Sequence, residues 1–500
     1  MVLIKSISGV RGTIHEEDNI GLSSSEIINC VNQFAFWLTN STINQKFTQQ
    51  TIAIGRDGRI SGQRISTLIA NSLVKLGFNI LDLGLTTTPS IQMAIVSEAC
   101  IAGIMISASH NPINWNGLKL LNYKGEFLSK KAGLEVFSNQ DKRLTKDWQY
   151  GTGDEFTWRR AAYAATGDIK GALAPGPLDD GLETEVIRSY DYIEKHMSSI
   201  LDLSDVDVES VKARKFKIVV DGINSSGGVY VPYLLEKLGV DVIKLNCNPN
   251  GKFAHNPEPL PQNLNALCEM VKKHQADLGI AVDPDVDRLV LVCEDGSFFG
   301  EEYTIVSIAD YILSKYKNSS VVSNLSTTMA VKDVANKLGA DHFESAVGEI
   351  NVVELMKKNN SIIGGEGSGG IIFAKSHYGR DALVGIALFL TQLSIVNLSA
   401  TELRKTFPDY YMLKEKIRVS NNLKLDFDNF VQHIIKSCEK HKDNYTLTDG
   451  IKIYYSCGSW AHVRNSNTEP LVRLIIESVD KVSAISIKTR LIDDINNYLK

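Results

Sequence analysis

Short apolar runs alternate with longer amphipathic stretches along most of the chain. The apolar runs have the length and β-branched content of buried strands, and we expect strands at Thr51–Ile54, Ile80–Leu83, Ile101–Ile106, Lys217–Asp221, Val240–Leu245, Leu278–Val282 and Leu289–Cys293. Apolar residues at helical spacing predict helices at Ile60–Leu76 and Tyr230–Leu238. Alternation of strand and helix predicts α/β domains with largely parallel sheets, whose ligands bind beyond the carboxyl ends of the strands.

Length and composition restrict the possible functions. A chain of 500 residues is too long for one hydrophobic core and predicts several domains. A net charge of −5 gives no reason to expect binding to nucleic acid or an anionic membrane. Met1–Gly12 does not resemble a secretory signal, and no apolar run approaches the roughly 18 residues needed to span a bilayer. The seven cysteines contain no Cys-x-x-Cys pair, which favours reduced thiols and a cytoplasmic protein.

One segment, Tyr150–Gly181, differs in composition from its surroundings. It is rich in Ala, Gly, Pro and Asp, whereas the rest of the chain favours Asn, Ile and Lys. We interpret it as a surface insertion between domains, and a functional lid is the alternative.

The first candidate for chemistry is the hexapeptide Ser107–Pro112, directly after an expected strand. Its Asn-Pro step favours a turn, so that the hydroxyls of Ser107 and Ser109 lie in a loop at the carboxyl end of that strand. A serine in such a loop can act as a nucleophile if another group activates it, and Lys119 supplies an amine nearby in the sequence. A polar turn without chemistry is the alternative.

Aspartates at every second position of a second short loop form a candidate metal site: Asp283, Asp285 and Asp287. Three carboxylates at this spacing can converge on one hard divalent cation. A calcium EF-hand would explain Glu294 but not Arg288, which stands where that loop needs glycine. We therefore favour Mg²⁺, which takes few protein carboxylates and leaves room for a phosphate oxygen; a solvated acidic turn is the alternative.

Two further segments are suited to binding a phosphosugar. The glycines of Gly364–Gly370 allow close approach to the backbone, and Glu366 and Ser368 can bond to sugar hydroxyls, although a glycine hairpin would look the same. Arg464–Pro470, with Arg473, combines guanidinium groups, hydroxyls and loop amides in a possible phosphate cradle. A surface turn with unrelated arginines is the alternative.

In this order, the four segments resemble those of the α-D-phosphohexomutases. The resemblance also includes Ser8–Gly12 and Gly55–Arg59, and covers nearly the whole chain except residues 150–181. It implies three related α/β domains with mixed or parallel sheets, plus a smaller C-terminal α+β domain, around a central cleft. The domain boundaries that we expect are 1–149, 182–300, 301–407 and 408–500.

The resemblance also implies roles for individual residues. Ser109 corresponds to the phosphoserine, and the catalytic group comprises Ser109, Lys119, Arg11 and His110. The expected ligands of Mg²⁺ are Ser109, Asp283, Asp285 and Asp287. The expected substrate-binding residues are Arg56, Arg288, Glu366, Ser368, His377 and Arg380. The expected phosphate-binding residues are Arg464, Ser466, Asn467, Thr468 and Arg473.

The implied activity is interconversion of a hexose 6-phosphate and a hexose 1-phosphate through a phosphoserine and a bisphosphate. A hexose 1,6-bisphosphate is the expected activator, and the partner is a small phosphosugar, with the oligomeric state left open. Lys119 is the candidate for handling the hydroxyl proton, which requires a lowered pKa. A non-catalytic phosphosugar-binding protein and a phosphatase with an aspartate nucleophile are the other hypotheses.

Two positions depart from the usual family pattern. Ser107 stands where Thr is common, and Gly370 stands where many members have His. The acid/base role of that His is then either absent or supplied elsewhere, with His377 as the candidate. We expect Gly370 to leave open space and a more negative charge beside Glu366, which suits an amino sugar. Segments 347–352, 365–370 and 377–381 resemble most the archaeal-type and Bacteroidetes-type phosphoglucosamine mutases, which predicts glucosamine 6-phosphate as substrate; phosphomannomutase/phosphoglucomutase is the alternative.

Deletion of Tyr150–Gly181, with a short Gly/Ser linker in its place, should retain most of the mutase activity, because the segment carries none of the candidate residues. Steady-state rates and a thermal melt of the deleted protein test this. A folded but inactive deletion protein would show that the segment contributes to catalysis or to an interface.

Overall fold

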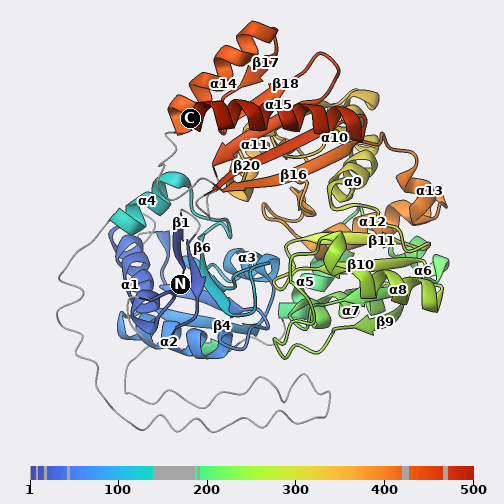
Figure 1. The fold of residues 1–500 in the computed structure, drawn as a ribbon. Helices are drawn as coiled ribbons and strands as arrows, with labels where there is room; N and C mark the ends of the chain where they lie inside the picture. Colours follow the sequence, from blue (N-terminus) through green and yellow to red (C-terminus); the bar gives the residue numbers. More distant parts are fainter. Residues whose placement is uncertain are drawn as a thin grey trace.

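The computed structural model describes residues 2–6, 9–15, 20–41, 46–138, 186–188, 192–418, 427–465 and 471–499. The strands in these ranges form four sheets that follow one another along the chain (Figure 1). Two expectations fall outside the described residues, namely the insertion at 150–181 and the clamp residues Ser466, Asn467 and Thr468.

The first sheet has seven strands in the order β1-β2-β6-β5-β3-β4-β7. Its strands are β1 (Leu3–Ser6), β2 (Gly9–Thr13), β3 (Thr51–Arg56), β4 (Asn79–Leu85), β5 (Ala102–Ile106), β6 (Trp115–Asn122) and β7 (Val186–Arg188). The accompanying helices are α1 (Ser24–Asn40), α2 (Gly62–Lys75), α3 (Thr88–Ser97) and α4 (Lys130–Ser138). Strands β3, β4 and β5 are parallel, and β6 returns antiparallel to β5.

The second sheet has the order β11-β10-β8-β9. Its strands are β8 (Lys217–Asp221), β9 (Asp241–Leu245), β10 (Leu278–Val282) and β11 (Leu289–Cys293). The helices around it are α5 (Tyr192–Leu201), α6 (Val208–Arg214), α7 (Gly227–Lys237) and α8 (Asn265–His274), with a 3₁₀ turn η3 (Pro261–Asn263) before α8.

The third sheet has the order β13-β12-β14-β15. Its strands are β12 (Ser320–Asn324), β13 (Asp341–Ser345), β14 (Ile363–Glu366) and β15 (Gly370–Phe373). The helices in this part of the chain are α9 (Glu301–Lys315), α10 (Ala330–Lys337), α11 (Glu349–Asn359), α12 (Ala382–Val396) and α13 (Ala400–Arg404).

The same four-strand arrangement occurs in all three α/β sheets. In each, two parallel strands lie beside a third parallel strand, which continues through a hairpin into an antiparallel neighbour; the hairpins are β5–β6, β10–β11 and β14–β15. The prediction of three related α/β domains with mixed or parallel sheets is therefore confirmed.

The C-terminal sheet is different, because all its neighbouring strands are antiparallel. The order is β16-β20-β19-β18-β17, formed by β16 (Tyr411–Arg418), β17 (Asn444–Thr446), β18 (Ile451–Tyr454), β19 (Trp460–Asn465) and β20 (Leu471–Ser478). The helices α14 (Phe427–His441) and α15 (Lys481–Leu499) complete the α+β domain, drawn in orange and red (Figure 1).

The distribution of hydrophobic cores fixes the second and third domains relative to each other. One continuous apolar cluster contains residues of both, from Met197 in α5 to Phe407 after α13. Helix α12 is the main reason, since most of its side chains are buried and Phe389 stacks edge-on against Phe299 at a centroid distance of 5.1 Å. The loops carried by these two domains are therefore held by a shared core, whereas the first and last domains have cores of their own.

The expected domain boundaries stay predictions. Strand β7 lies within 182–300 but pairs with β4 at the edge of the first sheet. Within the part of the chain that the structure describes, no helix combines the length and apolar character needed to cross a bilayer.

Candidate active site

Three loops that the sequence singles out occupy equivalent places in the three α/β domains. The serine loop joins β5 to β6, the aspartate loop joins β10 to β11, and the glycine loop joins β14 to β15. Each follows the carboxyl end of a parallel strand, where α/β sheets bind their ligands. Ser109 contacts Asp283 of the aspartate loop, and Arg380 bonds to both Asp287 and Glu366, so that the three loops belong to one site.

Ser109 has a constrained backbone. Its φ angle is +49°, in the left-handed region that non-glycine residues seldom adopt. Its N–H donates to Ser107 Oγ at 2.8 Å, and its own Oγ donates to Asp283 Oδ2 at 2.7 Å. The hydroxyl of Ser109 is thus aimed from the first domain at the aspartate loop of the second.

A buried arginine, Arg59, holds the serine loop in this conformation. Its guanidinium donates to the backbone carbonyls of Ser109, Asn111, Pro112 and Trp115 at 2.6 to 2.9 Å. Asp57, also fully buried, pairs with Arg59 Nε at 3.1 Å. Arg59 lies in the segment Gly55–Arg59, which carries only a family resemblance in the sequence, and it is not among the site residues that the sequence predicts.

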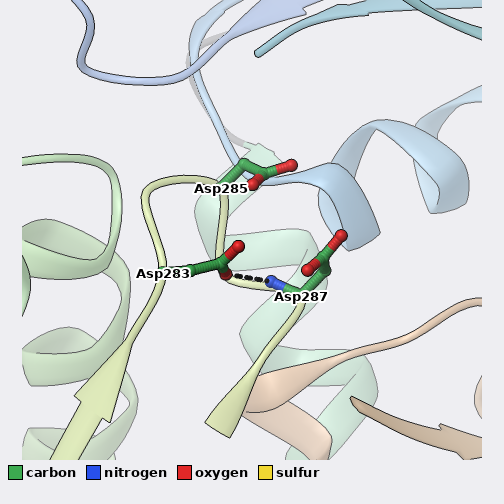
Figure 2. A group of neighbouring side chains, drawn as sticks. All are labelled: Asp283, Asp285 and Asp287. Atoms are coloured by element: carbon green, nitrogen blue, oxygen red, sulfur yellow. Dashed lines mark hydrogen bonds between the residues drawn. The ribbon is translucent and has the colours of Figure 1, made fainter. Parts of the chain in front are cut away.

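The three aspartates of the second loop converge (Figure 2). All three are fully buried, and each offers an oxygen within 4.8 Å of the others. Asp283 Oδ1 accepts from the N–H groups of Asp287 and Arg288 at 3.1 and 3.2 Å, and the turn requires a left-handed Val286 at φ +63°. Burial, and then repulsion from Asp287 and Asp285, raises the pKa of Asp283 well above its usual range.

The donor set fits a magnesium ion. Asp285 Oδ1 and Asp287 Oδ1 are buried and have no hydrogen-bond partner. Leaving a carboxylate oxygen desolvated and unpaired is costly, and a cation between these oxygens would remove that cost. A small set of carboxylates with room for phosphate oxygens is the ligand pattern that Mg²⁺ favours.

Lys119 lies across the same carboxylates. Its Nζ donates to Asp285 Oδ2 at 2.5 Å and to Asp287 Oδ2 at 3.0 Å, and Thr88 Oγ1 also donates to Asp285. Burial disfavours the charged amine, but attraction to the two aspartates outweighs it and raises the pKa of Lys119. The expectation of a lowered pKa is therefore wrong for this structure, and Lys119 is an ammonium that neutralises the aspartate loop.

Basic side chains lie near the serine loop. His110 Nδ1 is 3.3 Å from Ser109 Oγ, and burial together with the charges of Arg288 and Arg11 lowers the pKa of His110 well below its usual value, so that the ring is neutral. Arg11 donates to Asn111 Oδ1 at 3.5 Å, while the buried Nε of Arg288 has no hydrogen-bond partner. An unpaired buried guanidinium N–H suits an anion such as a phosphoryl group.

Arg380 connects the glycine loop to the aspartate loop. Its Nη1 donates to Glu366 Oε2 and its Nη2 to Asp287 Oδ2, both at 2.8 Å, and its Nε donates to Glu349 Oε2 at 2.9 Å. Glu366 Oε1 accepts from Asn324 Nδ2 at 2.8 Å and from the N–H of Gly348 at 3.1 Å.

The space beside Gly370 is not open, which corrects the expectation made from the sequence. A Cβ atom at position 370 would lie 2.4 Å from Cδ of Arg380. Glycine is needed because the arginine side chain passes over this position, and it places a cation beside Glu366 where we expected none.

His377, Arg56 and Ser368 complete the set of substrate-binding residues expected from the sequence. His377 Nε2 is 3.2 Å from Asp381 Oδ2. Asp381 caps the N-terminus of α12, and its Oδ2 is also 2.9 Å from His196 Nε2. Arg56 donates to Gln63 Oε1 and to the carbonyl of Asp57, both at 3.2 Å. Ser368 is half-buried in the turn between β14 and β15. A role for His377 in place of the missing family His stays a prediction.

Two arginines lie side by side in the C-terminal sheet. Arg464 on β19 and Arg473 on β20 are directly opposite each other in the antiparallel register. Like charges in this position repel, and an anion beside them would reduce that repulsion. Arg464 is buried, its Nε has no hydrogen-bond partner, and burial lowers its pKa.

Comparison with protein families identifies the chain. Family models for phosphoglucomutase/phosphomannomutase match all four parts in order: α/β/α domain I at residues 4–144, domain II at 191–296, domain III at 300–411 and the C-terminal domain at 416–493. The chain belongs to the α-D-phosphohexomutase family. It is accordingly an intramolecular phosphotransferase of the isomerase class.

Individual relatives of this phosphohexomutase carry more than one name. A phosphoglucomutase/phosphomannomutase of Thermococcus kodakarensis is 32% identical over 437 residues, which is 87% of each chain. A protein of Methanopyrus kandleri named probable phosphoglucosamine mutase is 28% identical over 89% of each chain. A phosphoglucosamine/phosphogalactosamine mutase of Sulfurisphaera tokodaii is 27% identical over 86% of this chain and 88% of its own.

Solved structures share the fold. A phosphoglucomutase/phosphomannomutase family protein of Burkholderia thailandensis superposes with a TM-score of 0.76 at 21% identity, covering 99% of this chain and 96% of its own. The match over all four domains agrees with the architecture described above.

Asp285→Asn should weaken Mg²⁺ binding by at least about tenfold, because a neutral amide replaces one of few charged ligands. Isothermal titration with Mg²⁺ measures this directly. The control is Asp295→Asn, a similar change on an exposed turn after β11. Equal Mg²⁺ affinity in the wild type and the Asp285 variant would exclude the aspartate loop as the metal site.

Proposed function

We propose that this phosphohexomutase interconverts hexose 6-phosphate and hexose 1-phosphate through a phosphorylated Ser109, with glucosamine phosphate as the preferred substrate. The observation that carries the proposal is the hydrogen bond from Ser109 Oγ to Asp283. It joins a strained, buried serine to a cluster of carboxylates suited to a divalent cation, within a ring of basic side chains.

Phosphoryl transfer depends chiefly on alignment and on neutralising the phosphoryl oxygens. Mg²⁺ held by Asp283, Asp285, Asp287 and Ser109 would supply positive charge at the phosphoryl group. Arg11, Arg288 and the ammonium of Lys119 add to that charge. Lys119 thus serves to stabilise charge as an ammonium.

The remaining elements of the site can hold either end of a sugar bisphosphate. Arg464 and Arg473 in the C-terminal domain would bind the phosphate that is not reacting, together with Ser466, Asn467 and Thr468. Glu366 and Ser368 would bind sugar hydroxyls between the two phosphates. A hexose 1,6-bisphosphate would act as the activator by phosphorylating Ser109.

The preference for glucosamine rests on relatives and on charge. Several similar archaeal proteins are named phosphoglucosamine mutases. A more distant N-acetylphosphoglucosamine mutase of Aspergillus fumigatus was solved with GlcNAc-6P and magnesium. Glu349 and Glu366 share the guanidinium of Arg380, which leaves one carboxylate charge that could attract a C2 ammonium. Phosphomannomutase/phosphoglucomutase activity is the second candidate, favoured by the name of the 32% identical relative.

Ser109→Ala should lower the mutase rate by roughly 10³-fold or more, because the variant has no phosphoryl acceptor at the site. Ser107→Ala is the matched control. Ser107 Oγ accepts a hydrogen bond from Ser109 N–H and donates one to Asp57, so the loss of this hydroxyl should reduce the rate only in part. Coupled assays measure the mutase rate of both variants, and melting curves check that both are folded. An active Ser109 variant beside an inactive Ser107 variant would reverse the assignment.

The specificity constant for glucosamine 6-phosphate should exceed those for glucose and mannose 6-phosphates by at least about tenfold, since a site built around a particular polar group rejects analogues that lack it. Steady-state rates with each sugar and its own bisphosphate activator measure the ratio. Equal or higher efficiency with glucose or mannose phosphate would leave the mutase assignment intact and remove the preference for glucosamine.

A further inference from the structure

The position of Arg380 raises a question about metal binding. Its side chain is 11% exposed, and its guanidinium donates to three carboxylates whose side chains are at most 8% exposed: Asp287, Glu349 and Glu366. These carboxylates come from three places in the chain, namely the aspartate loop, the start of α11 and the end of β14. One of them, Asp287, is an expected metal ligand.

A metal ion at Oδ1 and Arg380 at Oδ2 would therefore share the carboxylate of Asp287. Asp287 Oδ2 already accepts from Arg380 Nη2 at 2.8 Å and from Lys119 Nζ at 3.0 Å. A divalent cation at the aspartate loop withdraws charge from Asp287 and repels the guanidinium, because like charges this close interact strongly in a buried site. Glu366 and Glu349 can hold Arg380 after its bond to Asp287 weakens.

Release from Asp287 would also make a donor available. Glu366 belongs to the glycine loop, and Nη1 of Arg380 is bound to its Oε2. After its release, Nη2 stays close to Glu366, because Nη1 of the same guanidinium still binds that carboxylate. It would then be available to donate to a sugar hydroxyl oxygen.

We propose that Arg380 is an internal cation that Mg²⁺ displaces from Asp287, and that its released N–H then binds the sugar. Metal and phosphosugar thereby increase each other's affinity, since both favour the state in which Arg380 has left Asp287. The inference rests on the metal and sugar sites proposed above, and not on which hexose is preferred.

Titration of Mg²⁺ into the dephosphorylated full-length protein tests the proposal, with and without saturating 1,5-anhydroglucitol 6-phosphate. This probe has no anomeric hydroxyl and cannot accept a phosphoryl group at C1. In the wild type, the probe should tighten Mg²⁺ binding about fivefold or more. Arg380→Met keeps an apolar chain over Gly370 but removes the competing charge; Mg²⁺ alone should then bind about tenfold more tightly, and the probe should have no effect on it.

Two further variants make the outcome specific. Arg380→Lys retains the positive charge but lacks the planar guanidinium whose N–H groups can bind Glu366 and the sugar at once. The coupling between Mg²⁺ and the probe should therefore fall, and Mg²⁺ alone should bind no more tightly than in the wild type. Arg404→Met removes a guanidinium that pairs with Asp409 away from this cluster, and it should change neither affinity nor coupling. Melting curves confirm that the variants are folded.

A merely structural role for Arg380 predicts the opposite sign, because loss of structure weakens Mg²⁺ binding. Weaker or unchanged Mg²⁺ affinity in the Met variant, coupling that persists in it, or no Mg²⁺ binding by the wild type would each overturn the proposal. Failure of the glucosamine preference would instead appear only in the comparison of sugars, and would leave these titrations unaffected.

Discussion

Burial of three carboxylates in one tight loop is the constraint on which the rest of the site depends. Asp283, Asp285 and Asp287 are shielded from water, so that their mutual repulsion has to be compensated by nearby positive charge. Cations reach them from two other domains: Lys119 from the first and Arg380 from the third. The aspartate loop is thus compensated by side chains of the two neighbouring domains. Asp285 Oδ1 and Asp287 Oδ1 remain unpaired, at the place where a metal ion fits.

The repeated topology explains how three distant segments come to form one site. Each α/β domain carries its chemistry in the loop of the hairpin that ends its parallel strands: the serine, the aspartates and the glycines. A shared core fixes the second and third of these loops relative to each other. Polar contacts join the first domain to the second. Ser225 Oγ, for example, accepts from Gly58 N at 2.9 Å and donates to the carbonyl of Pro284 at 2.7 Å.

Much of this could be predicted from the sequence, because the signals are local. β-branched runs identify the buried strands, and β8, β10 and β11 have the bounds that the pattern predicts. Loops that follow such strands identify Ser109 and the aspartates. Pairings between distant residues carry no local signal. The clamp of Arg59 on the serine loop and the occupation of the space at Gly370 by Arg380 emerge only from the folded chain. The pKa of Lys119 was expected in the wrong direction for the same reason, since its partners lie in another domain.

In the proposed reaction, Ser109 carries the phosphoryl group, and its transfer needs a divalent cation at the aspartate loop. Mass spectrometry of peptides, after incubation of the protein with a hexose 1,6-bisphosphate in Mg²⁺ or in a chelator, tests both parts at once. We expect one phosphoryl group on Ser109, gained from the bisphosphate in Mg²⁺ and not in the chelator. A phosphoryl group on an aspartate, or equal labelling of Ser109 in the chelator, would contradict it.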